Sequence, residues 1–173
     1  MARKILVCFA PKRGATAEIS KRIAEVIRKS ELPVECKPID QVTSLLPHTG
    51  VVLGSAVYNG RWLKEASRFI IKNRNILADI PFWVFSSGPT GDVDIEEWFK
   101  EQNHSVKLKK ALEVTRPKSI RVFHGAFNPK NLNYYHKWRA NQASVNEGDF
   151  RNWESIEIWA DEIAASYKSL KSV

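Results

Sequence analysis

The chain has 173 residues, of which 43% are hydrophobic and 10% aromatic, a composition that excludes an intrinsically disordered protein. Its 27 Lys and Arg residues outnumber its 19 Asp and Glu residues, so the net charge is +8 and the surface favours anionic partners. No apolar run reaches membrane-spanning length and no signal peptide precedes the first apolar run, so we expect one domain, residues 1–173, in the cytoplasm.

Apolar runs alternate with amphipathic segments along the chain. The runs predict five strands, at Ile5–Phe9, Val34–Ile39, Val51–Gly54, Phe82–Ser86 and Ile120–Phe123. Helical spacing of apolar residues predicts helices from Thr16 to Ser30, over Trp62–Ile76, over Val93–Val114 as one broken helix, and from Trp153 onward. Strands alternating with helices predict a doubly wound α/β fold with a parallel sheet.

Three loops leave the carboxyl ends of predicted strands, at residues 10–16, 55–62 and 86–92. In an open parallel sheet such loops converge on one crevice, where ligands bind. In the first loop, Gly14 lets the backbone approach a ligand and Thr16 supplies an N-cap hydroxyl, at a helix N-terminus that favours an anion. The second loop offers two large aromatic residues, Tyr58 and Trp62. Together the loops indicate a site for flavin mononucleotide (FMN).

Other interpretations of these loops remain open. The first loop lacks the glycine patterns of nucleoside triphosphatases and of dinucleotide-binding folds, so neither ATP nor NAD is the leading ligand. Taken alone, the first loop is better explained as a tight turn from strand to helix with Thr16 as a plain cap; the company of the other two loops reverses that order. Trp62 opens a predicted helix, so core packing explains it almost as well as stacking on a flavin; Tyr58, beside the turn pair Asn59-Gly60, is the better stacking candidate.

The three loops resemble the flavin-contacting loops of a flavodoxin-domain family that includes the menaquinone-dependent protoporphyrinogen dehydrogenases. The resemblance rests on Arg13–Ile19, Gly54–Trp62 and Ser86–Pro89, and it continues through Gly148–Trp153 and Ile158–Ala164. It implies a flavodoxin-like three-layer sandwich with a five-stranded parallel sheet of order 2-1-3-4-5. The flavin-binding residues expected from the loops and the resemblance are Lys12, Arg13, Gly14, Ala15, Thr16, Ala56, Val57, Tyr58, Asn59, Gly60, Trp62, Ser87, Gly88, Pro89 and Gly91.

The resemblance also implies a reaction: oxidation of protoporphyrinogen IX in heme biosynthesis, with a quinone as electron acceptor. No catalytic side chain is required, because the electrons pass through the flavin. The partners expected are therefore a quinone or a redox partner protein, with a porphyrin-type substrate. Two alternatives stay open: a flavodoxin-type electron carrier that is not an enzyme, and a flavodoxin-like binding module that has lost FMN.

Two residues of the loops bear on these alternatives. Pro11 stands where the family usually has a Ser or Thr that binds phosphate, and proline removes both a hydroxyl and a backbone donor, which weakens the case for FMN. Arg61 places a cation beside the expected flavin, where flavodoxins tend to have acidic groups. A cation there stabilises the negative charge of the reduced flavin, which predicts a higher redox potential. A solvated Arg61 without this role is the alternative.

The connection at His124–Glu147 is long and mixes aromatic with basic residues. In the protoporphyrinogen dehydrogenases this segment is associated with substrate and quinone use, which here predicts shelter for a porphyrin and peripheral contact with a membrane. The alternative is a cover over the sheet edge followed by a solvated loop. The spacing of the four histidines predicts no metal site, and no nucleic-acid-binding motif is present.

Overall fold

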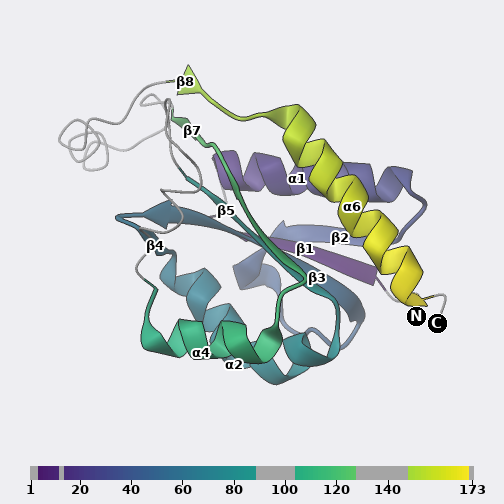
Figure 1. The fold of residues 1–173 in the computed structure, drawn as a ribbon, viewed down its shortest axis with the longest axis horizontal. Helices are drawn as coiled ribbons and strands as arrows, with labels where there is room; N and C mark the ends of the chain where they lie inside the picture. The colour runs from purple at the N-terminus through teal and green to yellow at the C-terminus, as the bar shows by residue number, and fades with distance from the viewer. Residues whose placement is uncertain (1–3, 12–13, 89–103, 128–147, 172–173) are drawn as a thin grey trace.

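The computed structural model describes residues 4–11, 14–88, 104–127 and 148–171, which form a parallel sheet between two layers of helices (Figure 1). The parallel strands are β1 (Lys4–Ala10), β2 (Val34–Pro38), β3 (His48–Tyr58), β5 (Phe82–Ser87) and β6 (Ser119–Phe123). They lie in the order β2-β1-β3-β5-β6. When only the five parallel strands are numbered along the chain, this is the predicted order 2-1-3-4-5. A sixth strand, β4 (Arg61–Trp62), pairs antiparallel with β3 and was not predicted.

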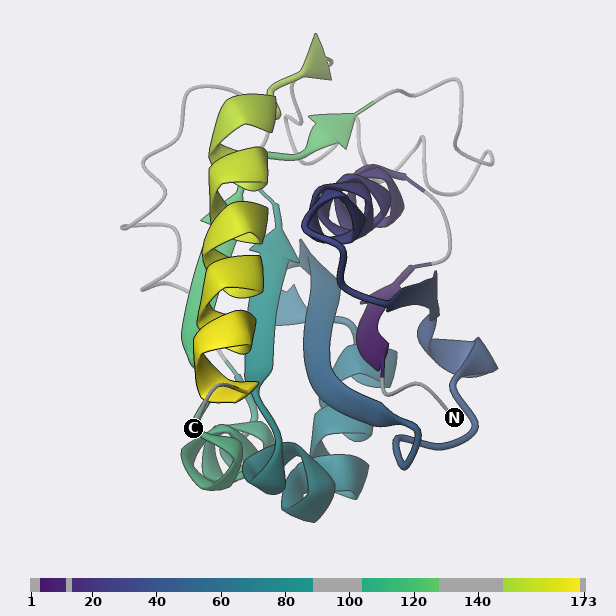
Figure 2. The same ribbon diagram turned by 90° about the vertical axis from the view of Figure 1, so that its right-hand side faces the viewer.

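Within the described ranges, two helices cover each face of the sheet. The helices α1 (Ala15–Lys29) and α6 (Trp153–Lys171) pack on one face, and α2 (Lys64–Asp79) and α4 (Val106–Thr115) pack on the other (Figure 2). Successive side chains of a strand point to opposite faces, so Ile5 and Val7 pack beneath α1 while Leu6 and Cys8 pack toward α2. The apolar runs read from the sequence are therefore strands that are buried on both sides.

The helices predicted at the two ends of the chain are confirmed. The apolar residues of α1 at positions 19, 23 and 27 are fully buried, and its basic residues Arg28 and Lys29 lie in the last turn, where they oppose the helix dipole. The last helix begins at Trp153, as the spacing predicts, and it buries Ile156, Ala160 and Ile163 against the sheet.

Most strand boundaries shift by one or two residues, and three elements differ more clearly from the prediction. The third strand extends from His48 to Tyr58, well beyond Val51–Gly54, because its first residues pair with β1 and its last residues, Val57 and Tyr58, pair with β4. The second helix begins at Lys64, since Trp62 belongs to β4. Of the helix predicted over Val93–Val114, the part described begins at Val106; residues 93–103 lie outside the described residues.

Smaller elements complete the described chain. A short 3-10 helix, η1 (Ile39–Gln41), follows β2, and β7 (Ala126–Phe127) pairs antiparallel with β8 (Gly148–Asp149). Cys8 and Cys36 are free thiols, and burial raises the pKa of Cys8 far above its usual range. No helix among the described residues is long and apolar enough to cross a membrane.

Candidate functional site

The carboxyl ends of β1, β3 and β5 meet at one end of the sheet, toward the left in Figure 1, where α1 also begins. The ladders bring Ala10 beside Ser55 and Ala56 beside Ser87. The strand register therefore brings together the three strand ends from which the predicted loops leave. Pro11 lies half-buried just beyond β1, whereas Lys12, Arg13, Pro89 and Gly91, which were predicted to bind flavin, lie outside the described residues.

The first turn of α1 presents backbone donors. Gly14 is the N-cap residue, with φ 89° and ψ −167°, and as a glycine it provides no side-chain cap. The first intrahelical bond runs from the Glu18 N–H to the Gly14 carbonyl at 3.2 Å, so the helix offers no acceptor to the N–H groups of Ala15, Thr16 and Ala17. A Cβ at Gly14 would have no atom within 4 Å, so it is the positive φ that requires glycine. These donors suit an anionic group.

Thr16 is not the N-cap residue that the sequence predicted. It is the second residue of the helix because Gly14 takes the cap position, and it is 2% exposed. Its Oγ1 lies 2.6 Å from the Ser87 Oγ, so the two hydroxyls form a buried hydrogen bond between α1 and the end of β5. The Thr16 hydroxyl therefore connects the first predicted loop to the third through a buried contact.

A tight hairpin connects β3 to β4. Asn59 (φ 51°) and Gly60 (φ 67°) form its two-residue loop between the paired residues Tyr58 and Arg61. Positive φ at both positions is the signature of a type I′ turn, and the tolerance for positive φ predicted for Asn59-Gly60 is confirmed. At the base of the hairpin, the Leu63 N–H donates to the Ser55 Oγ at 3.2 Å.

The hairpin separates the aromatic pair that was predicted to stack on a flavin. Tyr58 is 61% exposed, whereas Trp62 is 4% exposed and packs in the core between the sheet and α2. The Trp62 ring also meets the His104 ring edge-on, with centroids 4.9 Å apart. This geometry favours the core-packing interpretation of Trp62 and leaves Tyr58 as the aromatic side chain presented to a ligand. Of the other predicted hairpin residues, Ala56 is buried and Val57 half-buried.

The end of β5 is held from two sides. Ser87 bonds to Thr16, and the Gly88 N–H donates to the Phe123 carbonyl at 3.1 Å. Gly125 passes so close that a Cβ there would lie 2.8 Å from the Gly88 carbonyl oxygen. The neighbouring Ser86 is fully buried, and its Oγ has no hydrogen-bond partner within the part of the chain that the structure describes.

Comparison with known proteins accounts for this arrangement. The model of the flavodoxin domain matches residues 6–146, more than half of the chain. The chain belongs to the flavodoxin domain family. A comparison with curated proteins finds no match.

Solved structures share the fold of this flavodoxin domain. Rubredoxin oxygen:oxidoreductase from Desulfovibrio gigas superposes with a TM-score of 0.63 at 13% identity, over 99% of this chain and 38% of that one. A flavodoxin from the domain Archaea gives a TM-score of 0.59 at 12% identity, over 95% of this chain and 99% of its own. A flavodoxin from Streptococcus pneumoniae TIGR4 gives 0.57 at 20% identity, over 95% and 99%. The chain thus spans about 38% of the length of the Desulfovibrio gigas protein.

Sequence reasoning on the loops missed a charged cluster at the edge of this site. The Arg151 side chain is 8% exposed and bonds to the Asp149 carboxylate at 2.7 and 2.6 Å and to the Glu18 carboxylate at 2.5 Å. Its guanidinium also lies over the Trp153 ring, 4.5 Å from the centroid. The only sequence signal was the resemblance of Gly148–Trp153 to the family, which shows no partner for Arg151.

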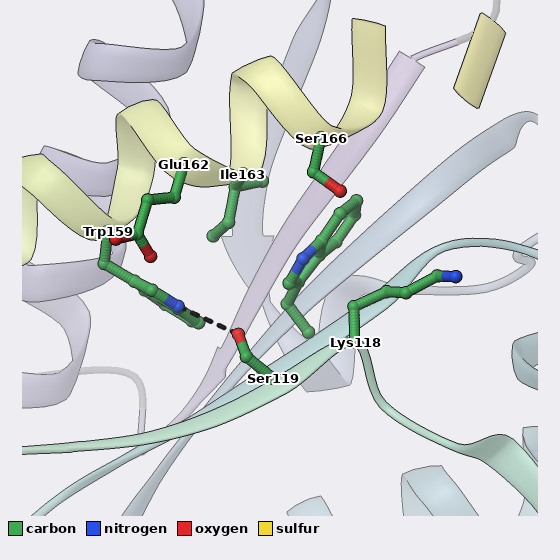
Figure 3. A pocket seen from close by; sticks show the side chains of 7 residues that line it. Lys118, Ser119, Trp159, Glu162, Ile163 and Ser166 are labelled. Carbon is green, nitrogen blue, oxygen red and sulfur yellow. Dashed lines mark hydrogen bonds between the residues drawn. The ribbon is translucent and has the colours of Figure 1, made fainter. Parts of the chain in front are cut away.

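A separate pocket of about 240 Å³ lies between α6 and the beginnings of β5 and β6 (Figure 3). There the Trp159 indole N–H donates to the Ser119 Oγ at 3.0 Å. The beginnings of parallel strands lie at the opposite end of the sheet from the three loops, so this pocket does not belong to the candidate flavin site. Among the described residues, no group of three or more His, Cys, Asp or Glu side chains is placed to hold a metal ion.

Proposed function

We propose that this flavodoxin domain binds FMN and transfers electrons through it. The observation that carries the proposal is the first turn of α1, where the N-cap residue Gly14 adopts φ 89° and provides no side-chain cap, in a chain of the flavodoxin domain family. Phosphate is the ligand chemistry that fits such a turn, since backbone donors and the helix dipole both favour an anion. The site therefore fits the phosphate end of FMN.

The remaining residues divide into those around the phosphate and those around the ring. The N–H groups of Ala15, Thr16 and Ala17 would hold the phosphate, assisted by Lys12 and Arg13. Tyr58, exposed on the hairpin, would cover the flavin ring, with Gly60 and Arg61 beside it. The other loop residues in the proposed site are Ala56, Val57, Asn59, Ser87, Gly88, Pro89 and Gly91.

When bound, FMN supplies the electron-transfer chemistry. The chain supplies position and charge: α1 orients the phosphate, Tyr58 excludes water from one side of the ring, and Arg61 brings a cation to the hairpin. Trp62 takes no part in stacking here, because its ring is buried against His104.

The finer proposal is quinone-linked oxidation of protoporphyrinogen IX. It is supported by the resemblance of Gly148–Trp153 and Ile158–Ala164 to the menaquinone-dependent protoporphyrinogen dehydrogenases, and by the aromatic and basic residues of 124–147. In this proposal the segment receives the porphyrin and contacts a quinone at a membrane surface.

An electron carrier that is not an enzyme is the second candidate. It is favoured by the superposition on whole flavodoxins, which the chain covers over 99% of their length. Turnover separates the two candidates: purified protein with FMN should oxidise protoporphyrinogen IX when menaquinone is present, whereas a carrier should only exchange electrons with a partner protein.

Both candidate functions require that the chain bind FMN, which the visible spectrum and an FMN titration of the apoprotein test. We expect saturable binding of FMN, and we expect Tyr58→Ala to weaken it about tenfold while Tyr58→Phe retains it, because the ring provides the stacking. No saturable binding would contradict the proposal and favour a module that has lost FMN. In that case Pro11→Ser, which restores a hydroxyl, would be the first variant to examine for recovered binding.

A further inference from the structure

Arg151 is a half-buried cation that pairs with two exposed carboxylates. It donates to both oxygens of Asp149 and to Glu18, and the Trp153 ring covers it. Glu18 and Asp149 carry two negative charges and Arg151 carries one positive charge, so the cluster is formally −1 with the arginine and −2 without it. The hydrogen bonds from Arg151 lower the pKa of Asp149 below its usual range, so this carboxyl stays ionised at neutral pH.

The cluster lies at the helix end that the proposed function assigns to the FMN phosphate. Glu18 belongs to the first turn of α1, and its own N–H makes the first intrahelical bond, to Gly14. One helical turn rises about 5.4 Å, which is shorter than the screening length of about 8 Å at physiological salt. An unpaired carboxylate on this turn would therefore repel a phosphate bound at Ala15–Ala17, and Arg151 offsets one of the cluster's two negative charges.

The same arginine fastens a second element to the site. Asp149 belongs to β8, which pairs with β7 through Ala126 and Asp149 and through Phe127 and Gly148. In the sequence these two strands flank residues 128–147, and both views place the two strands near the beginning of α1 (Figures 1 and 2). The bond from Arg151 to Glu18 connects the chain just after β8 to the first turn of α1.

We propose that Arg151 is a positioning residue of the flavin phosphate site, which offsets part of the negative charge of Glu18 and Asp149 and holds the paired strands β7 and β8 against the first turn of α1. The inference rests on the proposed function. It assigns a ligand preference to a residue outside the three loops: Arg151 acts on the phosphate of FMN and not on its ring.

The test compares FMN with riboflavin, which has the same ring and no phosphate. Arg151→Gln should weaken FMN binding to the apoprotein about tenfold and riboflavin binding less than about twofold, because only the phosphate feels the released carboxylates. The double variant Glu18→Gln with Arg151→Gln should regain most of the preference for FMN. Glu18→Gln alone should strengthen FMN binding about twofold to threefold, and it keeps the test valid if Arg151→Gln fails to fold.

Arg22→Gln is the matched control. Arg22 also joins α1 to the C-terminal part of the chain, with two bonds to Glu157 at 2.8 and 2.5 Å. It lies about one helical turn farther from the helix N-terminus than Glu18 does. We expect this variant to lower stability without changing the ratio of FMN to riboflavin affinity.

The outcomes separate the inference from the proposed function. Wild-type protein that binds neither flavin overturns the proposed function and this inference with it. Wild-type protein that binds FMN, with an unchanged FMN preference in Arg151→Gln and Glu18→Gln, overturns this inference alone. An equal loss of both ligands in Arg151→Gln, without recovery in the double variant, assigns Arg151 a structural role only and also overturns it.

Discussion

Gly54 illustrates at the scale of a single residue how closely the site end of the sheet is packed. It pairs directly with Phe85 in the ladder of β3 and β5, and the Phe85 ring lies over it. A Cβ at Gly54 would be 2.4 Å from the Phe85 Cζ. The ring has little room to move, because Phe123 and Trp159 pack against it with centroids 5.8 and 6.0 Å away.

We therefore expect Gly54→Ala to lower the free energy of unfolding by about 1–3 kcal/mol through overpacking. Urea unfolding of the wild type and the variant measures this loss. Adding Phe85→Leu should make the cost of Gly54→Ala smaller, because the shorter side chain leaves space for the new methyl group. If the two losses simply add, the contact with the Phe85 ring is not the cause.

Other single residues show what sequence patterns can and cannot predict. The positive φ of Asn59 and Gly60 follows from their residue types, because these side chains tolerate that conformation wherever the turn occurs. The cap role predicted for Thr16 was wrong. The N-cap is the residue just before the first helical residue, and because the helix begins at Ala15 that residue is Gly14.

At the scale of elements, the Thr16–Ser87 hydrogen bond connects α1 to β5 across the candidate site. Both side chains are at least 95% buried, and their oxygens lie 2.6 Å apart. A buried hydroxyl that loses its partner retains its desolvation cost, so breaking one side of such a pair is more harmful than replacing both sides.

We expect Thr16→Val and Ser87→Ala each to cost about 1–3 kcal/mol in the free energy of unfolding. The double variant should cost little more than the worse single variant, as a double-mutant cycle in urea would show. Losses that add in full would mean that the two hydroxyls do not stabilise each other.

A boundary could be predicted from the sequence only where the segment fitted a single kind of element. The helices α1 and α6 were predictable because their apolar residues repeat along one face over four turns or more. The start of α2 was not, because Trp62 fits both a helix face and the buried side of a strand. Its pairing with Val57 across the hairpin decided between them.

At the scale of the whole molecule, the excess of basic residues gives a net charge of +8, and Arg61 adds an exposed cation to the hairpin of the candidate site. Both features favour the extra negative charge that a bound flavin gains on reduction. For a one-electron step, about 60 mV of redox potential corresponds to ~1.4 kcal/mol of such stabilisation.

Arg61→Glu should accordingly lower the redox potential of bound FMN, by tens of millivolts on the order expected for solvent-screened charges. Spectroscopic titration with a reductant measures the change, and Arg74→Glu, an exposed site on α2, serves as the control for net charge. An unchanged or raised potential in Arg61→Glu would mean that Arg61 is only a solvated side chain.

The sequence by itself determined the alternation of elements, the flavodoxin-like sheet and the meeting of three loops at one end of it. It did so because strands covered on both faces must be continuous apolar runs, and because loops at the ends of parallel strands have to converge. Tertiary structure decided which side chains meet. Thr16 and Ser87 are 71 residues apart and Glu18 and Arg151 are 133 apart, and their contacts depend on strand register and helix packing, which no local pattern encodes.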